Sequence, residues 1–144
     1  MASILGAGRD RLESPAGTDP RQRARGYARQ MPHRIERDFA EHYVWGAVCD
    51  GWRLVDRGDL SVIEERVPPH GAEEWHVHER ARQFFYVLEG HAVMQTSQGD
   101  VALEPRTGVE IEPGLAHRFT NAGPEDVRFL VISAPSTRSD RVPA

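Results

Sequence analysis

The sequence contains no lysine and a single cysteine, Cys49, among its 144 residues. One cysteine excludes an intrachain disulfide and gives no indication of an oxidising compartment. No stretch reaches the ~18 apolar residues that a membrane-spanning helix needs, and the N-terminus shows no basic segment followed by a long apolar run. We therefore expect a cytoplasmic protein with no membrane partner.

Charge is distributed unevenly along the chain, although all 18 basic residues are arginine. Residues 1–37 hold eight arginines and four acids, a net charge of +4, whereas residues 38–144 hold ten arginines and eighteen acids, a net charge of −8. A basic arm can bind nucleic acid. Here acids interrupt the arginines, and Tyr27 is the one aromatic residue of the segment that could stack on a base. We therefore expect no nucleic-acid partner.

Local composition divides the chain into three regions. Residues 1–37 combine turn formers with a run of arginines, so we expect an N-terminal arm that is partly disordered or packs on a partner subunit. Residues 38–133 carry the folded domain. Residues 134–144 are expected to form a short polar C-terminal tail.

Short strands separated by turns dominate the chain from residue 43 onward. Their expected bounds are residues 43–49, 52–56, 60–67, 75–78, 83–88, 91–96, 101–104, 109–111, 117–120 and 127–133. A short helix could form at residues 32–42, where Ile35 and Phe39 lie four apart on one helical face. Many short strands without a long helical period predict an all-β sandwich or closed barrel, and the length allows one such domain.

A His-x-His pair, His76 and His78, lies on one of the expected strands. Side chains alternate between the faces of a strand, so both imidazoles project from the same face. At that spacing they can bind one transition-metal ion. Because the chain has seven histidines, such a pair alone is weak support for a metal site, and the surrounding residues must decide.

The residues around this pair resemble the cupin superfamily, whose first motif runs Gly, His-x-His, Glu, Gly and whose second runs Pro-x-Gly, His, Asn. The matching residues are His76, His78, Gln83 and Gly90 in the first motif and Gly114, His117 and Asn121 in the second. The resemblance covers residues 43–133 and implies a small single-domain bacterial cupin. The implied fold is a jelly-roll (double-stranded β-helix) barrel that holds one divalent transition metal, namely zinc, iron, nickel or manganese.

The same resemblance implies the metal ligands. They are His76, His78 and His117, with Gln83 in the fourth place, where the family usually has glutamate. Glutamine supplies no negative charge, so a divalent ion keeps its full charge and makes a bound water more acidic. Gln83 could instead direct its amide at a bound water or substrate, which would leave a three-histidine site.

Strand alternation also predicts the substrate contacts. If the ligands face inward, so do Glu74, Phe85 and Phe119, in a largely apolar pocket. Glu74 is then the best candidate for a general acid or base, and its alternative interpretation is a solvated strand end.

These features support a metal-dependent enzyme that acts on a small molecule. The absence of a carboxylate ligand favours Lewis-acid chemistry of the isomerase, cyclase or lyase type. An iron-dependent dioxygenase and a non-catalytic small-ligand-binding cupin are the alternatives. We expect the protein to act as a homodimer.

Overall fold

The computed structural model describes residues 32–144. This part of the chain contains eleven strands and one turn of 3-10 helix, η1, joined by loops. Their bounds are η1 Arg37–Phe39, β1 Glu41–Trp45, β2 Cys49–Asp56, β3 Ser61–Val67, β4 His76–His78, β5 Arg82–Glu89, β6 Ala92–Thr96, β7 Gly99–Leu103, β8 Gly108–Ile111, β9 His117–Thr120, β10 Val127–Ala134 and β11 Arg141–Pro143. Residues 1–31 of the predicted N-terminal arm lie outside the described part of the chain. The expected helix at 32–42 is reduced to η1, because both Ile35 and Phe39 are exposed and gain nothing by packing.

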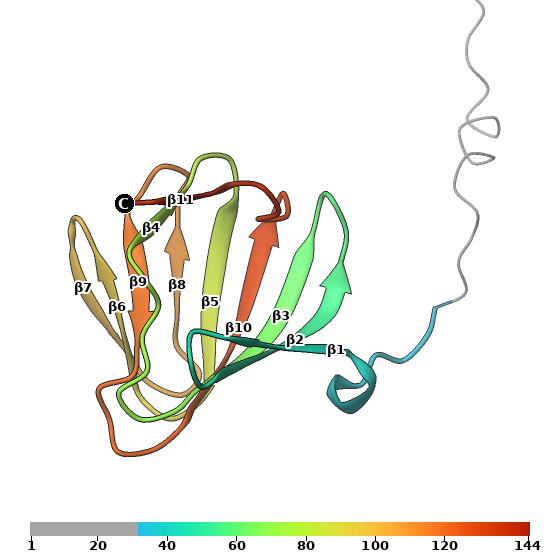
Figure 1. The fold of residues 1–144 in the computed structure, drawn as a ribbon, viewed down its shortest axis with the longest axis horizontal. Helices are drawn as coiled ribbons and strands as arrows, with labels where there is room; N and C mark the ends of the chain where they lie inside the picture. The colour runs from blue at the N-terminus through green and yellow to red at the C-terminus, as the bar shows by residue number, and fades with distance from the viewer. Residues whose placement is uncertain (1–31) are drawn as a thin grey trace, which may run out of the picture. The chain divides into compact units, whose positions relative to one another are not determined.

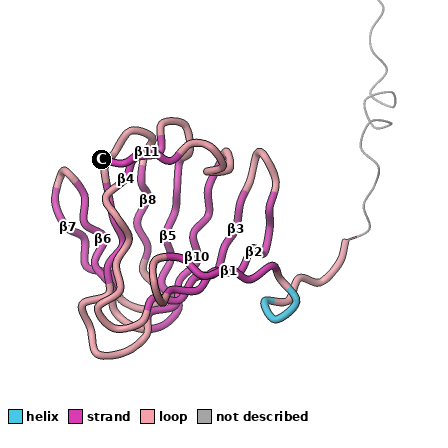
Figure 2. Tube along the Cα trace, viewed as in Figure 1, coloured by secondary structure: helices cyan, strands magenta, loops and turns pink. Residues whose placement is uncertain are grey.

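The strands form two antiparallel sheets (Figure 1). The first has the order β1-β2-β3-β10-β5-β8 and the second β11-β4-β9-β6-β7. Strand dominates the trace, with loops at both ends of the sheets (Figure 2). The predicted all-β jelly roll is confirmed. No helix among residues 32–144 is long and apolar enough to cross a membrane.

The hydrophobic core lies on the inner faces of the two sheets. Buried and half-buried residues alternate along β3 and β10, as the period of two requires. Three aromatic rings stack at the centre, with centroids 3.9 Å apart for Phe119 and Phe129 and 5.9 Å apart for Phe85 and Phe119. Each fully buried ring stabilises the fold by about 1.5–3 kcal/mol through area removed from water. The site described below lies beside this stack, since Phe85 also contacts His117 at 5.9 Å between ring centroids.

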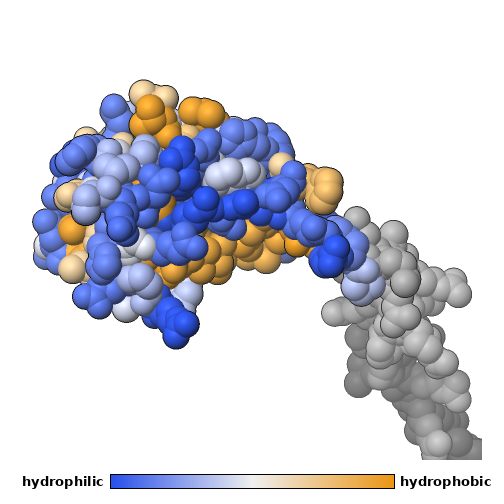
Figure 3. Space-filling model, turned by 90° about the horizontal axis from the view of Figure 1, so that it is seen from below, coloured by the Kyte–Doolittle hydropathy of each residue, from blue (hydrophilic) through white to orange (hydrophobic). Residues whose placement is uncertain are grey.

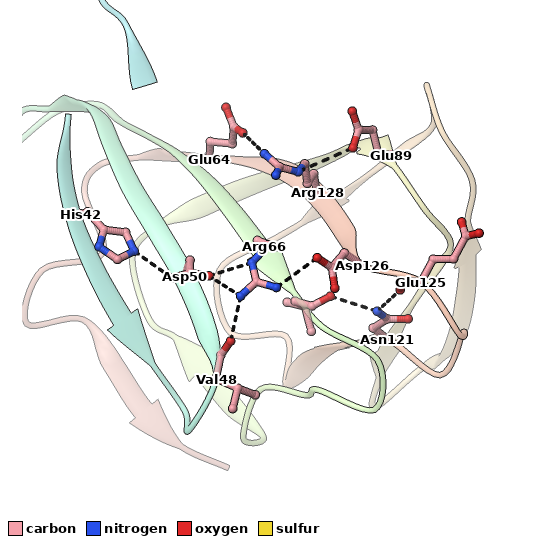
Figure 4. Close-up of polar contacts among 11 residues, drawn as sticks. His42, Val48, Asp50, Glu64, Arg66, Glu89, Asn121, Glu125, Asp126 and Arg128 are labelled. Atoms are coloured by element: carbon pink, nitrogen blue, oxygen red, sulfur yellow. Dashed lines mark hydrogen bonds and ion pairs between the residues drawn. The ribbon is translucent and has the colours of Figure 1, made fainter. Parts of the chain in front are cut away.

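Polar side chains tie the loops to the first sheet. Asn121, from the second motif, is buried, and its amide donates hydrogen bonds to the carbonyls of Val67 at 2.9 Å and Glu125 at 2.7 Å (Figure 4). The Arg66 guanidinium bridges Asp50 and Asp126 in the same view. The motif asparagine therefore satisfies buried backbone carbonyls and closes a turn.

Residues 134–144 do not form the expected polar tail. β11 pairs antiparallel with β4, so that Arg141 lies opposite His78 and Pro143 opposite His76. Asp140 is buried and accepts hydrogen bonds from the backbone amides of Arg80 and Ala81. A three-residue strand that ends in proline carries too little pattern to be recognised from the sequence. The C-terminal segment is thus part of the sheet that carries the histidine pair.

Candidate metal centre

Three buried histidines converge from two neighbouring strands. His76 and His78 lie on β4 and His117 begins β9, and the two strands pair with His76 directly opposite His117. One ring nitrogen from each histidine lies within 4.8 Å of the others. The ring centroids of His76 and His117 are 4.4 Å apart. The predicted histidine cluster is therefore present in the fold.

Gln83 reaches the cluster from β5, which belongs to the other sheet. Its Oε1 lies 3.1 Å from His117 Nε2, and its amide nitrogen donates to Ser133 Oγ at 3.3 Å. The bond to Ser133 directs the amide oxygen toward the histidine. Two ligand atoms that bind one metal ion at about 2.0–2.1 Å lie about 3.0–3.4 Å from each other. The distance between Gln83 Oε1 and His117 Nε2 therefore suits a shared ion.

Backbone carbonyls set the tautomers of two of the histidines. His76 Nδ1 lies 2.8 Å from the carbonyl of Glu74, and His117 Nδ1 lies 2.9 Å from that of Leu115. A carbonyl only accepts, so each contact favours hydrogen on Nδ1 and a lone pair on Nε2. At His117 the Gln83 oxygen is a second acceptor, and its approach to Nε2 is favourable either with the hydrogen on Nε2 or with a cation between the two atoms. His78 differs, because its Nδ1 is buried without a hydrogen-bond partner among the described residues.

The surroundings also favour the neutral form of all three rings. Burial lowers the pKa of His76 and of His117, and burial together with the two neighbouring histidines lowers that of His78 to about 4. Neutral imidazole is the form that binds metal. Three neutral nitrogens and one amide oxygen form a donor set that suits a divalent transition metal. The residues present therefore fit such an ion.

A cavity of about 160 Å³ opens beside the cluster, and its walls are polar. Besides His76, His78 and Gln83 it is lined by Tyr43, Arg53, Ile63, Glu65, Glu73, Phe85, Val131, Ser133, Thr137 and Arg141. The expected largely apolar pocket is therefore wrong. Its charged walls come from β2, β3, β11 and the loop before β4, elements that lie outside the two motifs from which the pocket was predicted.

The structure places the three predicted substrate contacts differently. Phe85 lines the cavity, whereas Phe119 is fully buried in the aromatic stack and is not among the described residues that line it. Glu74 is exposed, which corrects its expected inward orientation. Alternation does not extend back to it because β4 begins only at His76. Its neighbour Glu73 lines the cavity instead, and accepts the backbone N–H of Phe119 at 2.9 Å.

Glu65 and Tyr43 are two of the cavity residues that were not predicted from the sequence. The Tyr43 hydroxyl donates to Glu65 Oε1 at 3.0 Å. Burial, with the nearby carboxyl of Glu73, raises the pKa of Glu65 to about 8, and burial also raises that of Tyr43. A signal for Glu65 existed, since alternation along β3 places it on the same face as the buried Ile63 and Val67.

Comparison with known proteins gives one family. A family model described as "Cupin domain" matches residues 63–133, the span from β3 to β10. No curated protein matches the chain. The match includes all four candidate ligands and ends before the C-terminal segment that pairs with β4.

Solved structures share the fold at low sequence identity. A sugar phosphate isomerase from Silicibacter pomeroyi, described as a cupin, is 21% identical with a TM-score of 0.65, covering 72% of this chain and 76% of its own. The polyketide cyclase RemF from Streptomyces resistomycificus is 25% identical with a TM-score of 0.66. The match covers 78% of this chain and 83% of the cyclase. A predicted oxalate decarboxylase from Thermotoga maritima is 18% identical with a TM-score of 0.64. The match covers 72% of this chain and 100% of the decarboxylase.

Proposed function

The chain belongs to the cupin superfamily, and from this we propose that it is an enzyme using one divalent transition metal as a Lewis acid on a small oxygenated substrate. The three histidines and Gln83 would hold the ion. The reaction class would be isomerisation, cyclisation or elimination, in which protons move and no net oxidation occurs.

The donor set is the observation that carries this proposal. The backbone carbonyls at Nδ1 of His76 and His117 leave Nε2 of each ring to face a shared ion, and Gln83 brings a neutral oxygen to 3.1 Å from Nε2 of His117. The set contributes no negative charge, so an ion bound there would polarise a substrate oxygen strongly. The similarity at 25% identity to a structure described as a polyketide cyclase supports a reaction without net oxidation.

Glu65 would supply the acid-base chemistry that the sequence did not reveal. It lines the cavity with His76 and His78, and its pKa of about 8 keeps it protonated at neutral pH. A general acid or base is most effective when its pKa lies near the working pH. The hydroxyl of Tyr43 fixes one oxygen of the carboxyl and leaves the other to exchange a proton with a substrate.

The metal site can be tested on protein purified without an affinity tag. We expect elemental analysis to find close to one divalent transition metal per chain. His117→Ala should abolish retention of the metal, and Gln83→Ala should weaken its affinity about tenfold if the amide ligates. Gln98→Ala, an exposed glutamine, serves as the matched control. A wild-type protein that neither contains nor binds metal would contradict the proposal.

The reaction class can be tested without knowing the substrate. Metal-loaded protein is incubated in D₂O with a panel of hydroxyketones and keto acids, and deuterium entry next to the carbonyl is followed by NMR. We expect exchange for at least one compound, lost in Glu65→Gln and in His117→Ala. Consumption of oxygen by the ferrous protein with thiols, diketones or phenols, without exchange, would favour the dioxygenase. Tight binding without turnover would favour the binding protein.

A further inference from the structure

The C-terminal segment places a buried carboxylate behind one of the candidate ligands. Asp140 immediately precedes β11, and the pairing of β11 with β4 holds it next to His78. Its side chain is 1% exposed. Oδ2 accepts the backbone N–H of Ala81 at 2.9 Å, and Oδ1 accepts that of Arg80 at 3.1 Å. The carboxylate is thus fixed in one orientation by the loop that follows β4.

His78 is the ligand residue that needs such a partner. His76 and His117 are oriented by backbone carbonyls, whereas His78 Nδ1 is buried and unpartnered within residues 32–144. Asp140 Oδ2 lies 3.8 Å from this nitrogen. That distance exceeds a hydrogen bond, and a small rotation of the imidazole would close it.

We propose that Asp140 is a positioning residue that accepts the Nδ1 hydrogen of His78 and so directs His78 Nε2 into the metal cavity. This rests on the proposed metal site. A carboxylate behind a ligating imidazole fixes its tautomer and ring orientation and raises its basicity, and its loss typically costs ten- to a hundredfold in metal affinity. All three histidines would then present Nε2, two through carbonyls and one through Asp140.

The proposal assigns a role to a segment outside the motifs and outside the matched domain, residues 63–133. β11 also brings Arg141, whose Nη2 lies 3.3 Å from His76 Nδ1. The Nδ1 of His76 already donates to the Glu74 carbonyl. A guanidinium only donates, so Arg141 cannot accept the hydrogen of that Nδ1. Arg141 therefore adds positive charge beside His76, and the orienting contact comes from Asp140.

Asp140→Ala gives the test, because it removes Oδ2, the oxygen that accepts the N–H of Ala81 and also lies nearest His78 Nδ1. Without this acceptor the hydrogen is no longer held on Nδ1, and the fraction of His78 that carries it on Nε2, with no lone pair there for a metal, rises. The tautomer is read from long-range ¹H–¹⁵N spectra of the metal-free protein above pH 7, with His78 assigned from a His78→Gln spectrum. Zn²⁺ affinity is measured by competition with a chromophoric chelator.

We expect wild-type His78 to carry its hydrogen on Nδ1, and Asp140→Ala to shift it toward Nε2 and to weaken Zn²⁺ binding ten- to a hundredfold. Asp126→Ala, at a carboxylate that pairs with Arg66, should change neither. An unchanged tautomer and unchanged affinity, with only a lower melting temperature, would show that Asp140 merely caps the loop. If the wild type binds no Zn²⁺, the proposed function fails, and the tautomer of the metal-free protein still decides the role of Asp140.

Discussion

The buried carboxyl of Glu65 makes the stability of this protein depend on pH. Because its pKa is about 8 when folded and an ordinary 4.5 when unfolded, the folded protein retains, between these pH values, a proton that the unfolded chain has released. The unfolded state then binds fewer protons, so the free energy of unfolding falls as pH rises. The buried site histidines act in the opposite direction below pH 6.5, where the unfolded chain binds protons that the folded rings do not.

We therefore expect the metal-free protein to be most stable near pH 6.5 and to lose up to about 1.4 kcal/mol per pH unit between pH 6.5 and 8 from Glu65. Burial also raises the pKa of Glu73, so its proton affects stability in the same direction as that of Glu65. Glu65→Gln should flatten the slope measured by urea unfolding across this window. Glu64→Gln, one residue away on the opposite face and paired with Arg128, should leave it unchanged. A Glu65→Gln protein with the wild-type slope would refute the raised pKa.

At the scale of elements, the turn between β5 and β6, which carries the chain from the first sheet to the second, depends on a glycine of the first motif. Gly90 has φ of +79°, which is unfavourable for residues with a side chain. A Cβ there would lie 2.4 Å from the carbonyl oxygen of Asp126 and 3.0 Å from the Cα of Val127, both backbone atoms of another segment. The glycine is needed for the turn and also for close packing against the start of β10.

We expect Gly90→Ala to lower the free energy of unfolding by at least about 1–3 kcal/mol, the usual cost of a strained backbone conformation. Gly58→Ala is a matched control, because a Cβ at Gly58 meets no atom within 4 Å and its φ is not in the left-handed region. Thermal or urea unfolding of the two variants provides the measurement. Equal stability of both variants would show that the turn rearranges without cost.

On the scale of the whole molecule, the outer face of the first sheet carries apolar side chains. Phe84 and Leu88 of β5 are 40% and 39% exposed, and Ile132 of β10 lies opposite Phe84. Figure 3 shows hydrophobic residues gathered in a band on one side of the domain. Exposed apolar patches on small proteins mark interaction sites. We propose that a second copy of the chain covers this face, giving a homodimer.

We expect light scattering to give twice the chain mass at micromolar concentration. Phe84→Glu should shift the protein to monomer, because a charge at the centre of an apolar contact opposes burial. Val101→Glu, at an exposed position on β7 of the second sheet, should leave the mass unchanged. A wild-type monomer, or a Phe84→Glu dimer, would refute the proposed interface.

Local patterns in the sequence determined the all-β class, most of the strands and the same-face pair of His76 and His78, whereas His117 was added by resemblance to a family. Period-two alternation and turn residues are properties of neighbouring residues, so they can be read without knowing the topology. The motif residues also placed Gln83 near His117, although β5 and β9 belong to different sheets. That proximity followed from resemblance to a family, not from any local rule.

Only the tertiary structure decided which other side chains surround the candidate ligands. Glu65 and Tyr43 come from β3 and β1, and Asp140 comes with β11, all outside the two motifs. Glu73 replaced Glu74 because the irregular segment before β4 breaks the alternation on which the prediction depended. Pairing between distant strands fixes these positions, and neither its partners nor its register can be deduced from a three-residue strand.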